Sequence, residues 1–276
     1  MTLSGLQRLI READNTYLLG LVMLTVLVIG AVTVPMVSPF SPTRGTSLPL
    51  LPPSGENWFG TDNLGRDIFT RVFAAARLDM GLAIVAVSAS LLVGTLIGAV
   101  AGMAKRSRIS ALVTFFIDGV NAFPFIVLAL GIVAVVGPSL PGLLSAIVLT
   151  SWARYARMAK ARTAVIADAE FIQAARLLGY SRWRVMKRHV LPNVYSESFA
   201  FALSELVIVV LAIASLSFLG AGIRPPNAEW GAMISEGRIH LRRQWWLSVI
   251  PGLMLAFSAL AIQFIADGYS RMRRYA

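Results

Sequence analysis

Six long apolar runs constrain this chain more than any other feature of its sequence. They cover residues 18–37, 78–104, 111–136, 140–156, 198–222 and 247–267. A helix needs about 20 apolar residues to cross about 30 Å of bilayer hydrocarbon, so each run is an expected membrane span. Only 14% of the 276 residues are charged and 57% are hydrophobic, whereas about a quarter of a soluble domain is charged. The sequence predicts an all-α, polytopic membrane protein, with a cytoplasmic segment 1–17 before one membrane domain, 18–276.

Two of the runs carry residues that shape helix packing. The second run has Gly94, Gly98 and Gly102 at intervals of four, a small-xxx-small pattern that lets another helix approach closely. The third run contains Pro124, which lacks a backbone N–H and is predicted to kink its helix.

The surplus of positive charge predicts the orientation of the chain. The formal net charge is +11, and 17 of the 25 Lys and Arg residues fall in alternate segments that would share one side of the membrane. Because loops rich in Lys and Arg stay inside, both termini are predicted to be cytoplasmic. Nucleic-acid binding is disfavoured, since it needs a basic face on a soluble domain.

The N-terminus also invites a comparison with a secretory signal. Arg8 and Arg11 precede the first apolar run, but that run is longer than a signal-peptide core and five more follow. We therefore expect an uncleaved first span.

Signatures of catalysis are missing from the sequence. It contains no GxxxxGK[ST] phosphate loop and no GxSxG nucleophile turn, and it has two histidines and no cysteine. We therefore predict no catalytic, cofactor or metal site, and expect the energy for any uphill transport to come from another subunit.

The segment between the fourth and fifth runs, about 157–197, is predicted to be a structured cytoplasmic loop. Asp168–Leu178 has helical composition with acids at its N-terminal end, and Gly179 suits a left-handed turn. Ser181 is a suitable N-cap for a second short helix that would stop at Leu191-Pro192. This first helix has an apolar ridge of Phe171, Ile172, Ala174, Ala175 and Leu178. Its two adjacent alanines would let it fit a groove in another protein. The alternative is an amphipathic hairpin at the membrane interface.

This loop resembles the EAA motif of permease subunits of bacterial ABC importers. The resemblance rests on Gln173-Ala174-Ala175, then Gly179, then His189-Val190-Leu191-Pro192, and the ending Arg188–Asn193 is similar to the peptide/nickel branch. It implies a coupling helix that docks on an ATPase subunit. The residues so implied are Glu170, Phe171, Gln173, Ala174, Ala175, Gly179 and Pro192. Gln173 stands where the motif has its Glu, so the resemblance does not extend to a charge contact there.

Other segments resemble the C-type permeases of the dipeptide, oligopeptide and nickel importers. Residues 58–67 are similar to their GTDxxGRD segment, and residues 217–231 to their SFLGxG-PP-WG segment. Asp118 with Phe123-Pro124 is similar to a D-x4-FP motif. The resemblance spans residues 57–267, whereas the C-terminus ends at Arg273-Arg274-Tyr275-Ala276 instead of continuing into an LRDxLDPR tail.

The resemblance implies a type I ABC importer permease in the bacterial cytoplasmic (inner) membrane. Such a subunit forms half of a translocation pathway and pairs with a second homologous permease. Two ATPase subunits would bind ATP and Mg, and an extracytoplasmic solute-binding protein would deliver the substrate. Peptides are the first expectation for that substrate, nickel or a nickel chelate the second, and oligosaccharide the third.

A few single residues invite a functional interpretation. Four residues are candidates for the pathway or a gate: Asp118, Phe123, Pro124 and Glu205. The two acids are candidates because acids inside spans are costly, and the Phe123-Pro124 pair because of its expected kink. Asp118 also fits simple pairing with a nearby Arg, and Glu205 fits a buried hydrogen bond. A carrier of another class, driven by protons through Glu205 and Asp118, is the alternative mechanism.

Two further segments are expected to act outside the membrane. Pro225, Pro226 and Trp230 are candidates for contact with the solute-binding protein. The segment Asn57–Arg77 places apolar residues on one helical face and is expected to lie on the outer membrane surface or against the second permease.

Overall fold

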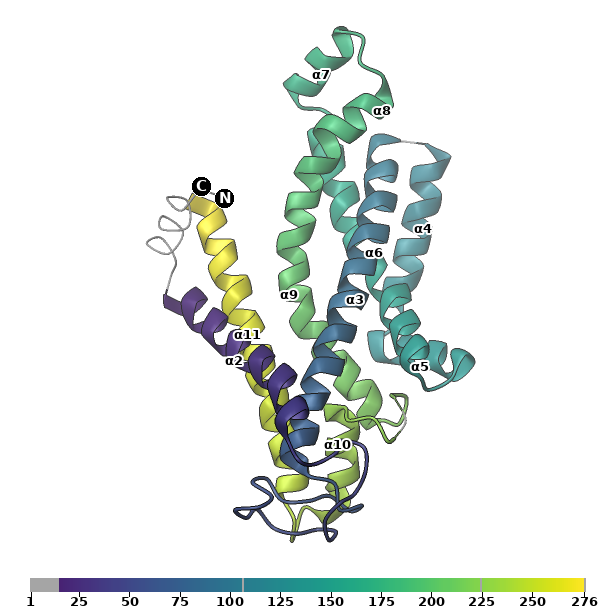
Figure 1. Cartoon of the computed structure of the whole chain (residues 1–276). Coiled ribbons are helices and arrows are strands. Elements are labelled where there is room, and N and C mark those ends of the chain that lie inside the picture. Colours follow the sequence, from purple (N-terminus) through teal and green to yellow (C-terminus); the bar gives the residue numbers. More distant parts are fainter. Residues whose placement is uncertain (1–14, 106, 224, 276) are drawn as a thin grey trace. The chain divides into compact units, whose positions relative to one another are not determined.

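The computed structural model describes residues 15–105, 107–223 and 225–275, and the regular secondary structure of these ranges is helical (Figure 1). One isolated bridge pairs Thr61 with Asp67. The helices are α2 (Asn15–Val37), α3 (Ile68–Met103), α4 (Arg108–Ala122), α5 (Phe125–Val136), α6 (Leu140–Ile166), α7 (Glu170–Leu177), α8 (Arg182–Val185), the π-helical η1 (Met186–Val190), α9 (Leu191–Phe218), α10 (Trp230–Gly237), the 3-10 helix η2 (Arg238–His240) and α11 (Trp246–Tyr275). The predicted all-α class is confirmed.

Four described helices are long and apolar enough to cross a membrane. They are Asn15–Val37, Ile68–Met103, Arg182–Phe218 and Trp246–Met272. A fifth span is possible if α4 and α5, which meet at 97°, are counted as one broken span. The expected number of six is not confirmed. Helix α6 contains the fourth expected run, but its second half carries Arg154, Arg157, Lys160 and Arg162, which make it less apolar than the others.

The chain divides into two compact units. The first comprises residues 1–84, 136–143 and 203–276, and the second comprises residues 85–135 and 144–202. The predictions about residues 1–14, including Arg8, Arg11 and most of the segment 1–17, concern residues outside the described ranges.

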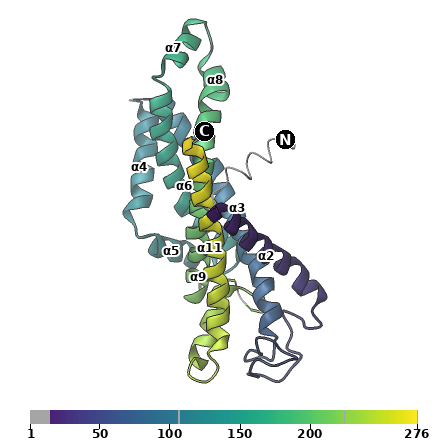
Figure 2. The ribbon, with the colours of Figure 1, turned by 90° about the vertical axis from the view of Figure 1, so that its left-hand side faces the viewer.

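In the first unit, α2 runs antiparallel to α11 (Figures 1 and 2). Two glycines permit this approach. A Cβ on Gly20 would lie 2.8 Å from Phe264 Cβ, and a Cβ on Gly268 would lie 2.4 Å from Tyr17 Cβ. Most of α2 is otherwise exposed and apolar, as a helix facing lipid would be.

In the second unit, the glycine pattern of α3 does what its spacing predicts. A Cβ on Gly94 would lie 2.4 Å from the carbonyl oxygen of Trp152, and one on Gly98 would lie 2.3 Å from that of Ala156. Gly102 likewise faces Thr163, at 2.6 Å from its Cβ. All three partners belong to α6, so the small-xxx-small stripe is the seam between α3 and α6.

The start of α3 differs from the expectation for residues 57–77. Residues 57–67 form a loop, and the helix begins at Ile68 and continues without a break to Met103. Ile68, Val72 and Ala76 are buried in the protein. The segment is therefore the first part of a long helix instead of a separate helix on the membrane surface.

The helical loop after α6 follows its predicted course up to Val190. Gly179 has a φ of +82°, which ends α7 in the left-handed conformation, and Tyr180 N donates to Ala175 O as in a Schellman turn. The hydroxyl of Ser181 accepts from Arg184 N and caps α8.

The predicted stop at Leu191-Pro192 is wrong. Leu191 N–H donates to Met186 O, five residues back, so the helix widens by one residue before Pro192 and continues as α9. A π turn of this kind removes the clash that a proline ring would make in a regular α-helix.

Candidate functional site

The segment from Asp168 to Val190, here called the α7–α8 hairpin, has a hydrophobic core of its own. Ile172 of α7 is fully buried and packs with Val185 and Val190, and Ala175 and Met186 are each 7% exposed. Alanines of α3 and α6 and residues that flank the hairpin complete this cluster: Ala99, Ala159, Ile166 and Val194. The core attaches the hairpin to α3 and α6.

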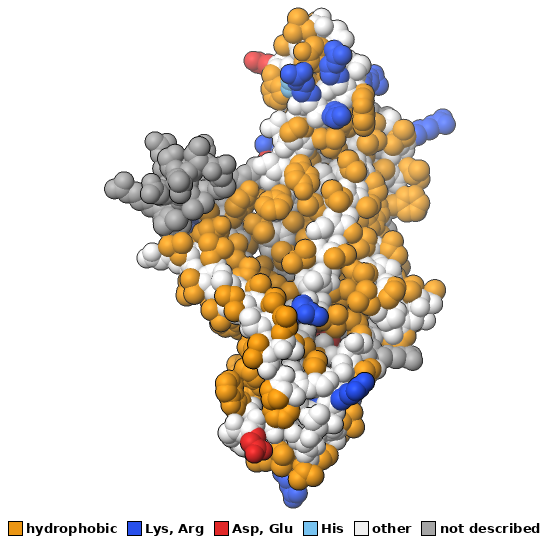
Figure 3. Space-filling view, in the orientation of Figure 1, with side chains coloured by type: hydrophobic (Ala, Val, Ile, Leu, Met, Phe, Trp, Pro, Cys, Tyr) orange, Lys and Arg blue, Asp and Glu red, His pale blue; other side chains and the backbone are white. Residues whose placement is uncertain are grey.

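The outward face of the hairpin is unusually apolar. Leu177 is 89% exposed, Leu178 78% and Phe171 51%. Figure 3 shows hydrophobic and basic side chains gathered at this end of the second unit. The predicted docking residues Glu170, Gln173, Ala174 and Gly179 are exposed here too, as is Pro192 at the start of α9. An exposed apolar patch of this kind is typical of a surface that meets another protein or a membrane.

Ala175 is a correction to the predicted docking set. The ridge expected to enter another protein's groove is divided, because Ile172 and Ala175 pack inward while Phe171, Ala174 and Leu178 face outward. The spacing of a single amphipathic helix cannot tell which of two adjacent apolar strips its own chain will cover.

Gln173 makes a contact that the motif Glu could not make. Its Nε2 donates to the carbonyl oxygen of Asp168 at 3.0 Å and closes the turn before α7. The Asp168 carboxylate pairs with Lys105, in the connection between α3 and α4. A carboxylate at position 173 has no N–H to donate, so this amide suits the local backbone of this chain.

Two of the predicted pathway or gate residues, Phe123 and Pro124, lie at the break between α4 and α5. Phe123 has an extended backbone, with φ −93° and ψ 141°, as is typical of a residue before proline, and α4 ends there. Phe123 is 58% exposed and Pro124 is exposed. The expected kink is thus a full break of the helix.

The two candidate pathway acids have different surroundings. Asp118 is exposed and accepts from Arg157 Nη2 of α6 at 2.6 Å, which agrees with the structural interpretation of this residue. Glu205 of α9 is 1% exposed, so it is buried within the chain.

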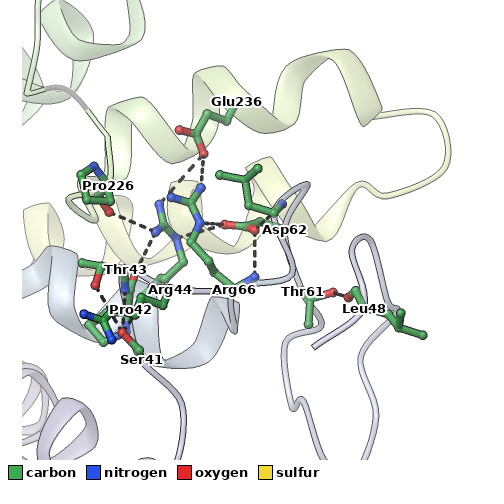
Figure 4. Close-up of polar contacts among 12 residues, drawn as sticks. Ser41, Pro42, Thr43, Arg44, Leu48, Thr61, Asp62, Arg66, Pro226 and Glu236 are labelled. Atoms are coloured by element: carbon green, nitrogen blue, oxygen red, sulfur yellow. Dashed lines mark hydrogen bonds and ion pairs between the residues drawn. The ribbon is translucent and has the colours of Figure 1, made fainter. Parts of the chain in front are cut away.

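A buried ionic network holds the first unit together near α10 (Figure 4). Arg66 Nε lies 2.6 Å from Asp62 Oδ2, and Arg71 Nε lies 3.3 Å from the same oxygen. Arg66 Nη2 also reaches Glu236 Oε2 at 3.1 Å, and Arg71 Nη1 donates to Pro42 O at 2.8 Å. Both arginines are 1% exposed. They fix the loop 38–67 against α10.

Sequence reasoning did not predict this network. Asp62 and Arg66 belong to the GTDxxGRD segment, and Asp67 of the same segment caps α3 by accepting from Thr70 N at 2.8 Å. The sequence did contain a signal for it, because charged residues so close to an apolar run need partners once they are buried. Glu236, however, lies 170 residues from Arg66 in the chain.

Trp230 is the second correction to the predicted sites. Its side chain is fully buried, its backbone N–H donates to Asp79 Oδ2, and its indole Nε1 donates to Val72 O, each at 3.0 Å. Because the side chain is buried and both N–H groups of Trp230 are satisfied inside the chain, this residue offers no surface to a solute-binding protein. Pro225 and Pro226, by contrast, are exposed.

Glu229 anchors the start of α10. Its two carboxylate oxygens accept from Gly231 N at 2.9 Å and Ala232 N at 2.7 Å. Burial raises the pKa of Glu229 above its usual value of 4.5, although the hydrogen bonds from these two backbone groups act in the opposite direction.

These features define a class of protein: a helical membrane subunit with a helical loop between two long helices. The same fold occurs in an amino acid ABC transporter, with a TM-score of 0.57 and 18% identity over 73% of this chain and 94% of that one. It also occurs in the MetNI methionine ABC transporter, with a TM-score of 0.56 and 16% identity over 73% of this chain and 95% of that one.

Residues 94–274 match the family described as the binding-protein-dependent transport system inner membrane component, and this chain belongs to that family. Curated relatives agree. A putative peptide transport system permease of Brucella suis is 35% identical over 95% of this chain and 88% of its own length. The dipeptide transport system permease DppC of Alkalihalophilus pseudofirmus is 35% identical over 93% and 84%. The di/tripeptide transport system permease DppC of Pseudomonas aeruginosa is 35% identical over 90% and 84%.

Family membership determines the general role of the chain. It is a multi-pass inner-membrane permease component of an ABC importer. Such a component works with ATPase subunits and a substrate-binding protein, and the partner subunits hydrolyse the ATP.

Proposed function

We propose that this chain forms half of a translocation pathway for peptides, in a heterodimer with a second homologous permease. Two ATPase subunits carry ATP and Mg, and an extracytoplasmic solute-binding protein delivers the peptide. The names of these relatives favour peptides over nickel or oligosaccharides. The proposed topology has six spans, with α6 as the fourth, and both termini in the cytoplasm.

The observation that carries the proposal is the outward apolar face of the α7–α8 hairpin. A hairpin that already has its own core does not need Leu177 and Leu178 for folding, yet both are almost fully exposed. Leaving such side chains in water is unfavourable unless a partner covers them. We assign this face to the ATPase subunit, with Glu170, Phe171, Gln173, Ala174 and Gly179 around it. Pro192 lies at the helical base, and Ala175 contributes from inside by supporting α7.

The test is to replace Leu177 by Asp in the complete transporter. A charge in a desolvated contact removes a large share of binding energy, so we expect at least about tenfold less copurified ATPase and a similar loss of ATP-dependent dipeptide uptake. Leu48→Asp is the matched control, because Leu48 is also exposed, at 71%, and lies in the loop 38–67. It should leave ATPase association unchanged.

Two results would contradict the proposal. One is normal ATPase association and uptake in Leu177→Asp. The other is dipeptide uptake driven by a pH gradient in liposomes that contain this chain without any ATPase, which would establish the proton-driven carrier instead.

The remaining candidate residues are proposed to lie along the pathway or at an outer surface. We place the break at Phe123-Pro124, with Asp118 and Glu205, along the pathway, and Pro225 and Pro226 at the surface that receives the solute-binding protein. The exposure of both prolines and the 97° bend between α4 and α5 support these assignments.

A further inference from the structure

A large cavity lies in the second unit, where the end of α3 and the start of α4 face the α7–α8 hairpin. Its volume is about 830 Å³. Its lining has two parts. One is apolar and includes Val100, Met103 and Ile109, and the other is polar and contains Lys105, Arg176 and Arg182. Figure 1 shows α7 and α8 beyond the ends of α3 and α4.

The apolar part continues a surface suited to lipid. Val100 is in the last turn of α3 and is 49% exposed, and Ile109 is in the first turn of α4 and is 57% exposed. Helix α3 is long and apolar enough to span a membrane, and α4 is part of the broken pair. These two side chains therefore lie where spanning helices end, at the depth of the lipid headgroups and the upper acyl chains.

The polar part has unneutralised positive charge. Asp168 is the only acid among the described residues of the lining, and it is already paired with Lys105. Within the described ranges, Arg176 and Arg182 have no ion-pair partner, and both are exposed. Two guanidinium groups that line the same cavity suit a phosphate, because each presents a planar set of donors that matches the phosphate oxygens.

Trp183 lies at the same cavity and is 70% exposed. An exposed indole beside cationic side chains and an apolar wall is typical of the headgroup region, where the ring is partly solvated and partly in contact with acyl chains. A site for free phosphate would have no need of the apolar wall.

We propose that this cavity binds an anionic phospholipid. Arg176 and Arg182 hold the phosphate, Trp183 covers the glycerol region, and the first part of an acyl chain lies on Val100, Met103 and Ile109. Basic pockets between spanning helices at a membrane surface bind such headgroups. The bound lipid connects the ends of α3 and α4 to α7, so it would restrict the hairpin that we assign to the ATPase.

The test uses the purified full-length chain in detergent and measures quenching of tryptophan fluorescence by brominated phosphatidylglycerol. Brominated phosphatidylethanolamine and inorganic phosphate are the comparison probes. The chain has six tryptophans, and Trp183 is the one in the described lining of the cavity. We therefore expect a saturable component of the quenching by phosphatidylglycerol that is lost in Trp183→Phe, and weaker quenching by phosphatidylethanolamine. Inorganic phosphate should not displace the lipid at equal concentration.

The charge requirement is tested with two double variants. In Arg176→Gln/Arg182→Gln, the midpoint for phosphatidylglycerol should rise roughly 30-fold, as expected for losing two cations near a headgroup. Lys187→Gln/Arg188→Gln is the matched control, because these exposed cations lie outside the cavity and the charge loss is the same. It should shift the midpoint less than about threefold.

Four results would overturn the proposal. Three of them are an equal shift in both double variants, equal affinity for the two lipids, and displacement of the lipid by inorganic phosphate. A fourth is unchanged lipid binding in Arg176→Gln/Arg182→Gln with loss of copurified ATPase, which would assign the two arginines to the subunit contact. Since lipid binding is measured on this chain alone, failure of the ATPase assignment in Leu177→Asp would leave this test unaffected.

Discussion

Arg66 and Arg71 show how single residues are constrained in the loop before α3. Each guanidinium is taken out of water, and each shares the same Asp62 carboxylate. A buried charge is tolerated only with close partners, and removal of one partner leaves the others unpaired. Asp62 is therefore the residue on which the network depends most.

Asp62→Asn should destabilise the protein by roughly 3–5 kcal/mol, because two buried cations would then face only the more exposed Glu236. The measurement is the unfolding midpoint in detergent. Asp168→Asn is the matched control, since its pair with Lys105 is at the surface and the effect should be below about 1 kcal/mol. Equal midpoints for the two variants would show that the buried network is not stabilising.

Glu229 provides a prediction about pH. Its folded-state pKa is raised by burial, so the folded protein holds its proton more tightly than the unfolded chain does. The stabilisation from this group is then fully present below its usual pKa of 4.5. It decreases as the pH rises through the raised pKa of the folded protein. In Glu229→Gln that decrease should be smaller.

The measurement is the detergent unfolding midpoint as a function of pH in both proteins. Glu229→Gln also removes the coulombic effect of Glu229 on Asp79, which accepts from Trp230 N at the start of α10, so the difference between the two curves reports this pair of carboxyl groups. Parallel curves for wild type and Glu229→Gln would contradict the prediction.

At the scale of elements, α3 supplies two glycines with opposite surroundings. Gly98 lies against the backbone of α6, and a Cβ there would be 2.3 Å from Ala156 O, whereas a Cβ on Gly81 would meet nothing within 4 Å. The same substitution on the same helix therefore separates packing from helix propensity.

Gly98→Ala should cost about 1–3 kcal/mol, because the backbone of α6 must move to admit a methyl group. Gly81→Ala should be neutral or stabilise by up to about 1 kcal/mol, since alanine loses less conformational entropy in a helix. Unfolding midpoints in detergent measure both. A stabilising effect of Gly98→Ala would show that the two helices are not in close contact.

At the scale of the whole molecule, the main prediction concerns orientation in the membrane. The sequence has no cysteine, so a single introduced cysteine can be labelled without background. Leu177→Cys and Leu48→Cys place thiols at positions 89% and 71% exposed. Positive-inside topology predicts that residue 177 is cytoplasmic and residue 48 is outside.

A membrane-impermeant maleimide applied to intact cells should label Leu48→Cys, and should label Leu177→Cys only after the membrane is permeabilised. The reverse pattern would invert the proposed topology. Labelling of both positions in intact cells would mean that the two lie on the same side, which would contradict the proposed number of spans between them.

Much of the fold could be predicted from local sequence. Gly94, Gly98 and Gly102 indicated a close helix contact, Gly179 a left-handed turn and Ser181 an N-cap, and all three features are present. The stop at Pro192 could not be judged correctly, because a π turn upstream can absorb a proline and local propensity does not reveal it.

The candidate site was only partly predictable for a related reason. The hairpin and its motif were located from the sequence, but the exposure of Leu177 and the burial of Ala175 depend on Val185 and Val190 packing beneath α7. Trp230 was assigned to an external contact, although Val72 and Asp79 enclose it. Those partners lie more than 150 residues away along the chain.

By itself, the sequence determined that this chain is a helical membrane protein and that its long helical loop is a place of contact. Apolar length, glycine spacing and capping residues act over a few helical turns, so they can be recognised without a partner. Only the tertiary structure decided which α7 face is covered, which helix receives the α3 glycines, and how Arg66 meets Glu236. Burial is a property of surfaces brought together from distant parts of the chain, and local patterns do not encode which surfaces meet.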